Sequence, residues 1–402
     1  MKVTGIIAEY NPFHNGHKYQ IDQIKKDGSD YIIAVMSGNF SQRGEAAIVD
    51  KFARTRMALA EGVDLVIELP VCFAVNSAGT FAAGGVSILD NLGVVDNLAF
   101  GIEPHCEQSL LKLASFLASP PSLYESELDN NLRAGMSFPM ARKNALAGFF
   151  TQEELAGIDK PNSILAVEYC RVIHKLGSHI QPVPIQRVGG AYNDKELDID
   201  GMSSAGAIRL LLSDYYASNR DSKALSRTLA LLRDHMPSEC VDILENSEIL
   251  FQNDFSEMLH YKLLTTKNFA DYADITTSFG SRIEAAKSEF LDYDSFCGSL
   301  KSKNITYTSV NRLLTHILLD MKISYPQIPP YARVLGFREE SSPLLSHIKK
   351  NSRIPLITKV ADADPIPLLL QDIKATDIYN ACITAKYGKF KRNDYTHGVI
   401  IV

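Results

Sequence analysis

An apolar run, Val3–Ala8, leads directly into the polar segment EYNPFHNGH at residues 9–17, and this junction constrains the fold more than any other part of the chain. A continuous apolar run of this length is typical of a buried strand, and the proline-containing segment ends it. Apolar residues at helical spacing follow and predict a helix over His17–Lys26. Because the first N–H groups of a helix lack partners within it, the junction predicts an anion site at the end of a strand.

Within this junction, His14 and His17 are three residues apart, so both imidazoles lie on one side of the first helical turn and can reach one phosphate. Gly16 lets a nucleotide approach the backbone, and Lys18 adds a positive charge. A turn with two solvated histidines is the alternative, but the strand before and the helix after favour a phosphate site. The pattern resembles the HxGH signature of the nucleotidyltransferase superfamily, whose histidines stabilise the α-phosphate of ATP while pyrophosphate leaves.

The composition narrows the class of protein further. The 402 residues suggest two or three domains, and the net charge of −6 gives no general attraction to nucleic acid, so any such binding needs a local patch. The six cysteines are far apart and form no C-x-x-C pair, which favours reduced thiols over disulfides or a zinc site. The chain shows neither a signal-like apolar segment at its start nor an apolar stretch of 18 residues. We therefore expect a cytoplasmic protein without a membrane span and without a metal site built from its own side chains.

Strand-like and helix-like segments alternate through the first half of the chain. This alternation predicts a Rossmann-like, doubly wound parallel sheet of the α/β class. Such sheets bind ligands beyond the carboxyl ends of their strands, where His14, Gly101 and residues 37–39 fall. The strand candidates are Val3–Ala8, Tyr31–Met36, Leu65–Leu69, Val94–Phe100 and Ile180–Ile185. The helix candidates are His17–Lys26, Lys51–Glu61, Ser77–Leu92, Glu107–Leu117 and a further helix opened by Pro161.

The character of the chain changes beyond about Asp214, where helical patterns continue with few strand signals between them. We expect a catalytic domain over residues 1–214, with a helical insert at about 119–159, and a mainly α-helical domain over residues 215–402 with a small α/β or irregular tail. The helix candidates in the second half are Ser222–Leu232, Glu239–Asn253, Asp254–Thr265 and Ser309–Met321.

Two more polar segments fall near the expected strand ends. In residues 203–209 (SSAGAIR), Ser204 can cap a helix or bind phosphate, and Arg209 can balance charge on the β- and γ-phosphates. The alternative is a simple serine N-cap with a surface arginine. The loop 37–45 carries Arg43, a candidate contact for a small carboxylate substrate, although a plain surface loop has the same appearance.

Longer strings make the resemblance more specific. Residues 5–17, 36–44 (MSGNFSQRG) and 331–337 (YARVLGF), with 375–379 and 394–396 near the end, resemble the bacterial tRNA(Met) cytidine acetate ligase family. The resemblance covers essentially the whole chain. It implies that ATP and free acetate are used to acetylate the exocyclic amine of the wobble cytidine of elongator tRNA(Met), which forms N4-acetylcytidine.

The family resemblance also implies roles for individual residues. Catalytic roles fall to His14, His17, Lys18 and Arg209. Gly101 would leave room for the adenosine, Asn162 would bind ribose or base unless it caps a helix, and Arg187 would lie beside the triphosphate. Mg²⁺ is expected with ATP, bound through phosphate and water. The implied ATP site consists of Ile7, Ala8, Glu9, Tyr10, Asn11, Pro12, Phe13, His14, Asn15, Gly16, His17, Lys18, Tyr19, Gln20, Gly101, Asn162, Arg187 and Ser204.

Basic residues gather in the second half of the chain. Residues 386–392 (KYGKFKR) place four cations and two aromatics in seven residues without an acid. Such runs neutralise phosphates and stack on unpaired bases, although a solvated face is the simpler alternative. Together with the resemblance they predict that the second half binds tRNA, and no protein partner is evident. Further basic groups are Lys349, Lys350 and Arg353, and Lys301, Lys303 and Arg312.

The sequence therefore predicts an ATP-dependent ligase, with two alternatives left open. A small-molecule adenylyltransferase would share the ATP site but would need no basic helical domain. A non-enzymatic RNA-binding protein on a nucleotidyltransferase fold would not need the histidines, and the intact His14, His17, Lys18 and Arg209 argue against it.

Overall fold

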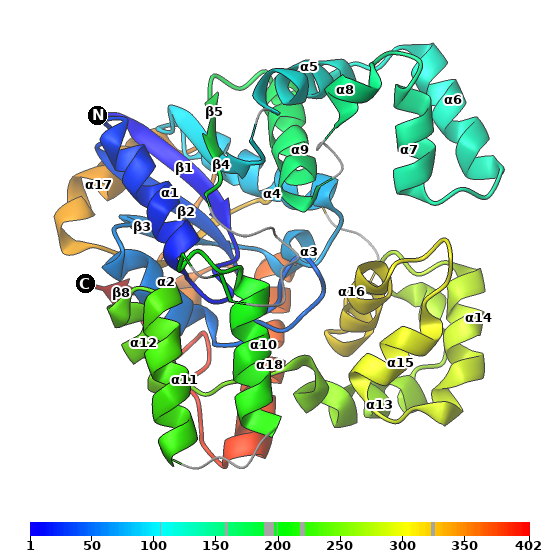
Figure 1. Cartoon of the computed structure of the whole chain (residues 1–402). Helices are drawn as coiled ribbons and strands as arrows, with labels where there is room; N and C mark the ends of the chain where they lie inside the picture. Colours follow the sequence, from blue (N-terminus) through cyan, green and yellow to red (C-terminus); the bar gives the residue numbers. More distant parts are fainter. Residues whose placement is uncertain (105, 157–159, 189–196, 199, 218–221, 323–325) are drawn as a thin grey trace.

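Five parallel strands form the centre of the structure, a computed structural model that describes residues 1–104, 106–156, 160–188, 197–198, 200–217, 222–322 and 326–402 (Figure 1). The last residues of the predicted helical insert, 157–159, lie outside the described residues. The strands are β1 (Val3–Ala8), β2 (Tyr31–Ser37), β3 (Leu65–Leu69), β4 (Asn97–Ile102) and β5 (Gln181–Gln186). Four of them match the predicted strands within a residue or two. The strand β4 begins three residues later than predicted. Val94 and Val95 precede it and are buried, so in the sequence they have the apolar character of strand residues.

The strands lie in the order β5-β4-β1-β2-β3, so the chain moves outward from β1 first in one direction and then in the other. This order confirms the predicted doubly wound α/β fold. The direction reverses between β1 and β4, and the carboxyl ends of these two neighbours form the crevice where doubly wound sheets bind their ligands.

Both faces of the sheet are covered by helices, which explains why the strands read as continuous apolar runs. In β2, Ile33 and Val35 pack into the core that contains α3 (Val71–Ala74), α4 (Ala78–Asn91) and α9 (Pro161–Leu176). Their neighbours in β2 pack instead against helices that include α1 (Asn15–Lys26), α2 (Lys51–Ala60), α10 (Ala205–Ala217), α11 (Ser222–His235) and α12 (Ser238–Glu245). The helices α5 (Glu107–Ala118), α6 (Ser122–Arg133), α7 (Phe138–Leu146) and α8 (Gln152–Leu155) extend from the sheet at one side (Figure 1).

The second half of the chain returns to this sheet. The strand β6 (Ala332–Phe337) pairs antiparallel with β3, and β7 (Leu356–Ile357) and β8 (Ile400–Ile401) pair with β6. The boundary predicted at residue 214 therefore does not describe the sheet, whose last three strands come from beyond it. Sequence reasoning missed β6 because it contains a charged residue, Arg333, whose ion-pair partner Glu68 is far away in the sequence.

A group of four helices precedes β6 in the sequence and lies beside the sheet (Figure 1). It consists of α13 (Ser256–Thr265), α14 (Thr277–Ala286), α15 (Tyr293–Leu300) and α16 (Tyr307–Leu318). The remaining helices, α17 (Ser342–Asn351) and α18 (Pro367–Tyr387), follow β6. The long helix α18 was not predicted, since apolar residues lie all around it and leave no amphipathic pattern. No helix within the described ranges combines the length and apolar character that a membrane crossing requires.

Candidate active site

A cavity of about 220 Å³ lies at the carboxyl ends of β1, β4 and β5 and against the first turns of α1, α9 and α10. It is therefore at the crevice between β1 and β4 where the strand order reverses. Most of the predicted ATP-site residues line it. These are Ile7, Ala8, Glu9, Tyr10, Asn11, His14, Gly16, His17, Tyr19, Gln20, Gly101, Asn162, Arg187 and Ser204, with the predicted catalytic Arg209.

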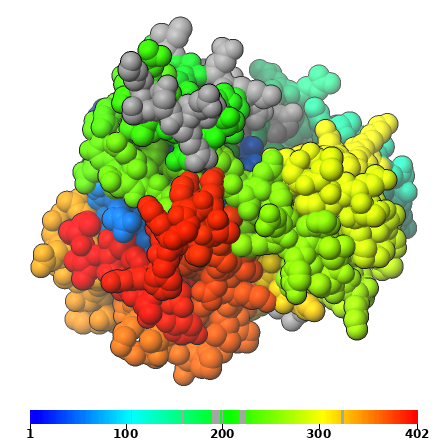
Figure 2. All heavy atoms as spheres, turned by 90° about the horizontal axis from the view of Figure 1, so that it is seen from below, coloured from blue at the N-terminus to red at the C-terminus, as the bar shows by residue number. Residues whose placement is uncertain are grey.

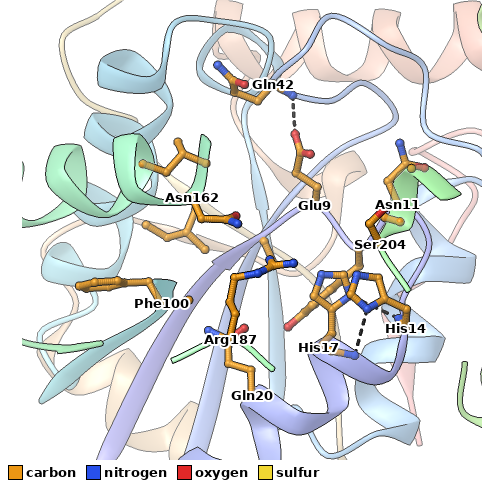
Figure 3. A pocket seen from close by; sticks show the side chains of 18 of the residues that line it. Glu9, Asn11, His14, His17, Gln20, Gln42, Phe100, Asn162, Arg187 and Ser204 are labelled. Carbon is orange, nitrogen blue, oxygen red and sulfur yellow. Dashed lines mark hydrogen bonds between the residues drawn. The ribbon is translucent and has the colours of Figure 1, made fainter. Parts of the chain in front are cut away.

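The two histidines face each other at the start of α1. His14 is the N-cap of the helix, and its Nδ1 accepts a hydrogen bond from the Gly16 N–H at 3.0 Å. The Nδ1 of His17 accepts one from the His14 N–H at 3.3 Å (Figure 3). The rings are stacked, with centroids 3.8 Å apart and planes inclined by 28°. Both imidazoles are thus fixed by the backbone that they cap.

This arrangement decides the charge and the hydrogen-bonding role of both rings. Because each Nδ1 accepts a backbone N–H, each neutral ring carries its proton on Nε2 and can donate it to a ligand. Burial, with the positive charges of Arg187 and Arg209, lowers the pKa of His14 to about 3. Burial and the neighbouring His14 and Arg187 also lower the pKa of His17 well below its usual value. The pair therefore acts as two neutral N–H donors at pH 7, beside arginines that supply the positive charge.

Gly16 is required by the histidines themselves. A Cβ at this position would lie 2.9 Å from Cε1 of His14, closer than real Cβ atoms come to a neighbour. The sequence explained Gly16 by the approach of a nucleotide, and the structure adds that a side chain would displace the ring that caps the helix.

Arg187, Arg209 and Ser204 line the cavity together with the histidine pair. Nη1 of Arg209 donates to the carbonyl oxygen of Asn11 at 2.8 Å, and its Nη2 is 3.3 Å from a carboxylate oxygen of Glu45. The hydroxyl of Ser204 accepts from the N–H of Ala207 at 3.1 Å, so Ser204 caps α10 while lining the cavity. Together these groups make an anion site from two helix N-termini and two guanidinium groups.

The other side of the cavity is less charged. In Figure 3, Arg187 lies between the two histidines and a group that contains Phe100 and Asn162. Asn162 is the second residue of α9 and not its N-cap, and its buried Nδ2 has no hydrogen-bond partner among the described residues. A Cβ at Gly101 would touch Cγ of Arg187 at 3.4 Å. An aromatic ring with an unpartnered amide donor suits the base or ribose of a nucleotide.

Tyr10 has an unusual backbone at the end of β1. Its φ of +48° lies in the left-handed region that non-glycine residues rarely adopt. The ring contacts both Phe13 and His17, with centroids 4.9 Å away in each case. Its buried hydroxyl has no partner in the described part of the chain. Strained residues of this kind gather at functional sites. With this backbone conformation, the ring of Tyr10 packs against that of His17.

A loop after β2 closes the cavity opposite the histidines. The carboxyl of Glu9 accepts the N–H of Gln42 at 2.6 Å, and burial raises the pKa of Glu9 despite Arg209 and Arg43 nearby (Figure 3). Arg43, the predicted carboxylate contact, also lines the cavity. The buried guanidinium of Arg54 donates to the carbonyls of Glu9, Ser37 and Gly38, which ties the ends of β1 and β2 together.

The helices beside the sheet hold the same loop from outside. Asn311 of α16 donates to the carbonyl of Arg43 at 3.0 Å, and Thr315 donates to that of Gly44 at 2.5 Å. Gly44 has a φ of +79°, and a Cβ there would lie 2.5 Å from the backbone nitrogen of Arg312, so no other residue fits. The helical part of the second half is thus in direct contact with the loop that lines the cavity.

Four predicted ATP-site residues do not line the cavity. Phe13 is fully buried below it, and Pro12 follows a cis peptide bond. Asn15 donates to the carbonyls of Gly201 and Asp234, so it anchors α1. The ammonium of Lys18 is 2.8 Å from Asp22 and does not reach the cavity.

The basic run at residues 386–392 is more paired than the sequence suggested. Its three lysines form ion pairs: Lys386 with Asp254, Lys389 with Glu248, and Lys391 with Asp50 and Glu248. Such partners come from distant parts of the chain, and the run alone could not reveal them.

Sequence reasoning also missed part of the cavity lining. Several of these residues follow predicted ones at helical spacing, as Leu165 and Tyr169 follow Asn162 on one face of α9, and this spacing could have identified them. The lining residues without a predicted role are Ser41, Gln42, Glu45, Phe81, Phe100, Leu165, Tyr169, Ile185, Gln186, Val188, Met202, Ala205 and Gly206.

A parallel sheet with a histidine pair at its switch point defines a nucleotidyltransferase, and a sequence model of the HIGH Nucleotidyl Transferase family matches residues 1–394. A tRNA(Met) cytidine acetate ligase of Clostridium perfringens is 37% identical over 394 residues, which cover 94% of this chain and 95% of the relative. The crystal structure of apo Thermotoga maritima TmcAL has a TM-score of 0.90 and 32% identity over the whole of both chains. The same protein bound to α-thio ATP has a TM-score of 0.87 and 33% identity, covering 100% of this chain and 99% of the other. The chain belongs to the tRNA(Met) cytidine acetate ligase family.

Proposed function

We propose that this chain activates acetate with ATP and transfers the acetyl group to the wobble cytidine of elongator tRNA(Met). The observation that carries the proposal is the pair of neutral imidazoles with protons on Nε2, fixed at a helix N-terminus in the cavity that Arg187 and Arg209 also line. Relatives named for this activity cover nearly the whole chain, and one solved relative binds an ATP analogue. This favours a ligase over the small-molecule adenylyltransferase and over the non-enzymatic RNA-binding protein.

The first step would join acetate to ATP. An oxygen of acetate attacks the α-phosphorus, and pyrophosphate leaves as acetyl-adenylate forms. Acetate is ionised at pH 7, because carboxyl groups titrate near pH ~4, so this step needs no general base. It requires positioning and neutralisation of the charge that develops on the phosphates. His14, His17 and Arg209 would supply N–H donors and positive charge there, while Arg43, which also lines the cavity, would bind the acetate.

The second step would transfer the acetyl group to RNA. The exocyclic amine of cytidine attacks the acetyl carbonyl, loses a proton and expels AMP. The tRNA contacts are proposed for the second half of the chain, whose helix α16 touches the loop that carries Arg43. Binding of RNA there can thereby influence the acetate side of the cavity.

Mg²⁺ would enter with ATP. The described residues contain no group of three or more His, Cys, Asp or Glu side chains that could hold a metal ion. Mg²⁺ often keeps several waters and binds mainly to substrate phosphates, and the cavity fits that mode better than a protein cage. The ion would neutralise phosphate charge, while the residues above orient the two reactants.

The experiment that tests the first step is exchange of labelled pyrophosphate into ATP. We expect exchange that depends on acetate and occurs without tRNA, because acetyl-adenylate formation is reversible and involves only the cavity that His14 and His17 line. Exchange that is independent of acetate would indicate a different carboxylate or a plain adenylyltransferase. Absence of exchange with acetate, ATP and Mg²⁺ present would contradict the proposed first step.

A further inference from the structure

A second cavity, of about 240 Å³, lies between the start of α2 and the segment after α18. It shares no lining residue with the first cavity, but both border the loop that joins β2 to α2. Its lining includes Asp50, Phe52, Arg56, Phe390, Arg392 and His397. Figure 2 shows the C-terminal residues, in red, on the surface of the molecule, with a small blue area from the first part of the chain beside them.

Three aromatic rings line this second cavity, those of Phe52, Phe390 and His397. Phe390 is 86% exposed, so its ring is not explained by packing in a core. Phe52 and His397 are stacked with centroids 3.5 Å apart and planes only 6° from parallel. Burial lowers the pKa of His397, which keeps its ring neutral. The exposed ring of Phe390 lines the same cavity as this stack, and a further flat ring can lie on it.

Two arginines complete the second cavity. Arg56 and Arg392 are exposed, and within the described ranges neither side chain forms an ion pair with a carboxylate. The neighbouring Lys391 differs, because Asp50 and Glu248 hold it at 3.2 and 2.6 Å. In the basic run, therefore, Arg392 is the cation that is available to a ligand, and Arg56 joins it from α2.

A buried network of ion pairs anchors the segment 390–397, which carries Phe390, Arg392 and His397. Asp394 lies 2.9 Å from Lys51 and 2.8 Å from Arg333, and both cations also pair with Glu68 at 2.7 and 2.8 Å. All four side chains are at most 4% exposed. Because Asp394 lies between Arg392 and His397 in the sequence, this network holds the rim of the second cavity in place.

We propose that the second cavity binds one unpaired nucleotide of an RNA, with its base on Phe390 and its phosphate at Arg56 and Arg392. Base stacking on an aromatic ring, combined with arginine on the phosphate, is how proteins bind single-stranded RNA. The proposal rests on the proposed function for the RNA itself. In this proposal the principal RNA contacts are Phe390, Arg56 and Arg392, and not the lysines of the basic run.

The test is direct binding of a tRNA(Met) transcript to two variants of the full chain, Phe390→Ala and the double variant Arg56→Ala/Arg392→Ala. Loss of a stacked base should raise the dissociation constant by roughly 5- to 100-fold for Phe390→Ala. Loss of the contact to this one phosphate should reduce the magnitude of the slope of log K against log salt by about 0.7 in the double variant. Phe138→Ala and Arg133→Ala change exposed residues of α7 and α6, and they serve as controls that should leave both quantities unchanged.

Acetate-dependent pyrophosphate exchange, measured without tRNA, separates this proposal from the proposed function. Both variants should exchange at the wild-type rate, since none of the changed residues lines the first cavity. Unchanged RNA affinity and salt slope in both variants would overturn the nucleotide site, whatever the exchange rate. Variants that keep RNA affinity but lose affinity for poly-glutamate would overturn it too, in favour of an acidic peptide. Failure of exchange in the wild type, with RNA binding lost in the variants, would reject only the ligase chemistry.

Discussion

Replacing His14 separates its two roles, because the ring caps α1 through Nδ1 and faces the cavity with the Nε2–H. Asparagine is among the best N-cap residues, whereas alanine is among the poorest. In His14→Ala the Gly16 N–H loses its acceptor, which should cost about 1 kcal/mol of unfolding free energy. In His14→Asn the cap is retained, and stability should stay within a few tenths of a kcal/mol of wild type.

Catalysis should respond differently, because neither replacement presents an imidazole Nε2–H. Loss of one preorganised donor to developing charge costs about 10²–10³-fold in rate, or roughly 2.7–4 kcal/mol. Acetate-dependent pyrophosphate exchange should therefore fall by at least about 10²-fold in both variants. The measurements are urea unfolding for stability and exchange for activity, with His174→Asn on the exposed side of α9 as the matched control.

Two results would refute this reasoning. Exchange by His14→Asn within about threefold of wild type would show that His14 only caps the helix, since a lost donor costs far more. Equal loss of stability in the alanine and asparagine variants would show that the cap is not what the ring contributes.

Three further outcomes follow from the structure. The free energy of unfolding should fall as the pH drops below about 6.5, because His14 binds a proton in the unfolded chain but not in the folded protein, where its pKa is about 3. Between pH 7 and pH 5, His14→Asn should lose about 2 kcal/mol less of this free energy than wild type, as measured by urea unfolding. Arg333→Met should lower the free energy of unfolding by about 3–5 kcal/mol, because the buried carboxylates of Glu68 and Asp394 lose a positive partner. Arg338→Met, which breaks a surface ion pair, should lower it by at most about 1 kcal/mol. Equal losses in the two variants would contradict this. Asn162→Ala should leave stability within about 0.5 kcal/mol of wild type, since its amide has no described partner to lose, yet raise KM for ATP up to about tenfold; an unchanged KM would place the nucleotide elsewhere.

The central sheet could be predicted because its information is local. Apolar runs, helix patterns and the motif at residues 9–17 lie within short stretches, and the strand order then brings their ends together. The motif alone also identifies both histidines. What it could not supply was their tautomer and charge, which depend on backbone hydrogen bonds and on Arg187 and Arg209 from distant segments.

The parts that were missed depend on partners far apart in the sequence. In β6, Arg333 pairs with Glu68 and Asp394 inside the protein, and the ammonium of Lys18 pairs with Asp22. A one-dimensional pattern reads each of these charges as a solvated or ligand-binding group. Only the fold shows which charges are already neutralised.

The most direct test of the account is mass spectrometry of tRNA(Met) after incubation with the full chain, ATP, Mg²⁺ and isotopically labelled acetate. We expect one labelled acetyl group on the wobble cytidine, with one AMP and one pyrophosphate formed for each acetyl group transferred. Omission of ATP should abolish labelling, and acetyl-CoA should not replace ATP and acetate. Acetylation from acetyl-CoA without ATP, or an unmodified cytidine while ATP and acetate are present, would contradict an acetyl-adenylate route in this cavity.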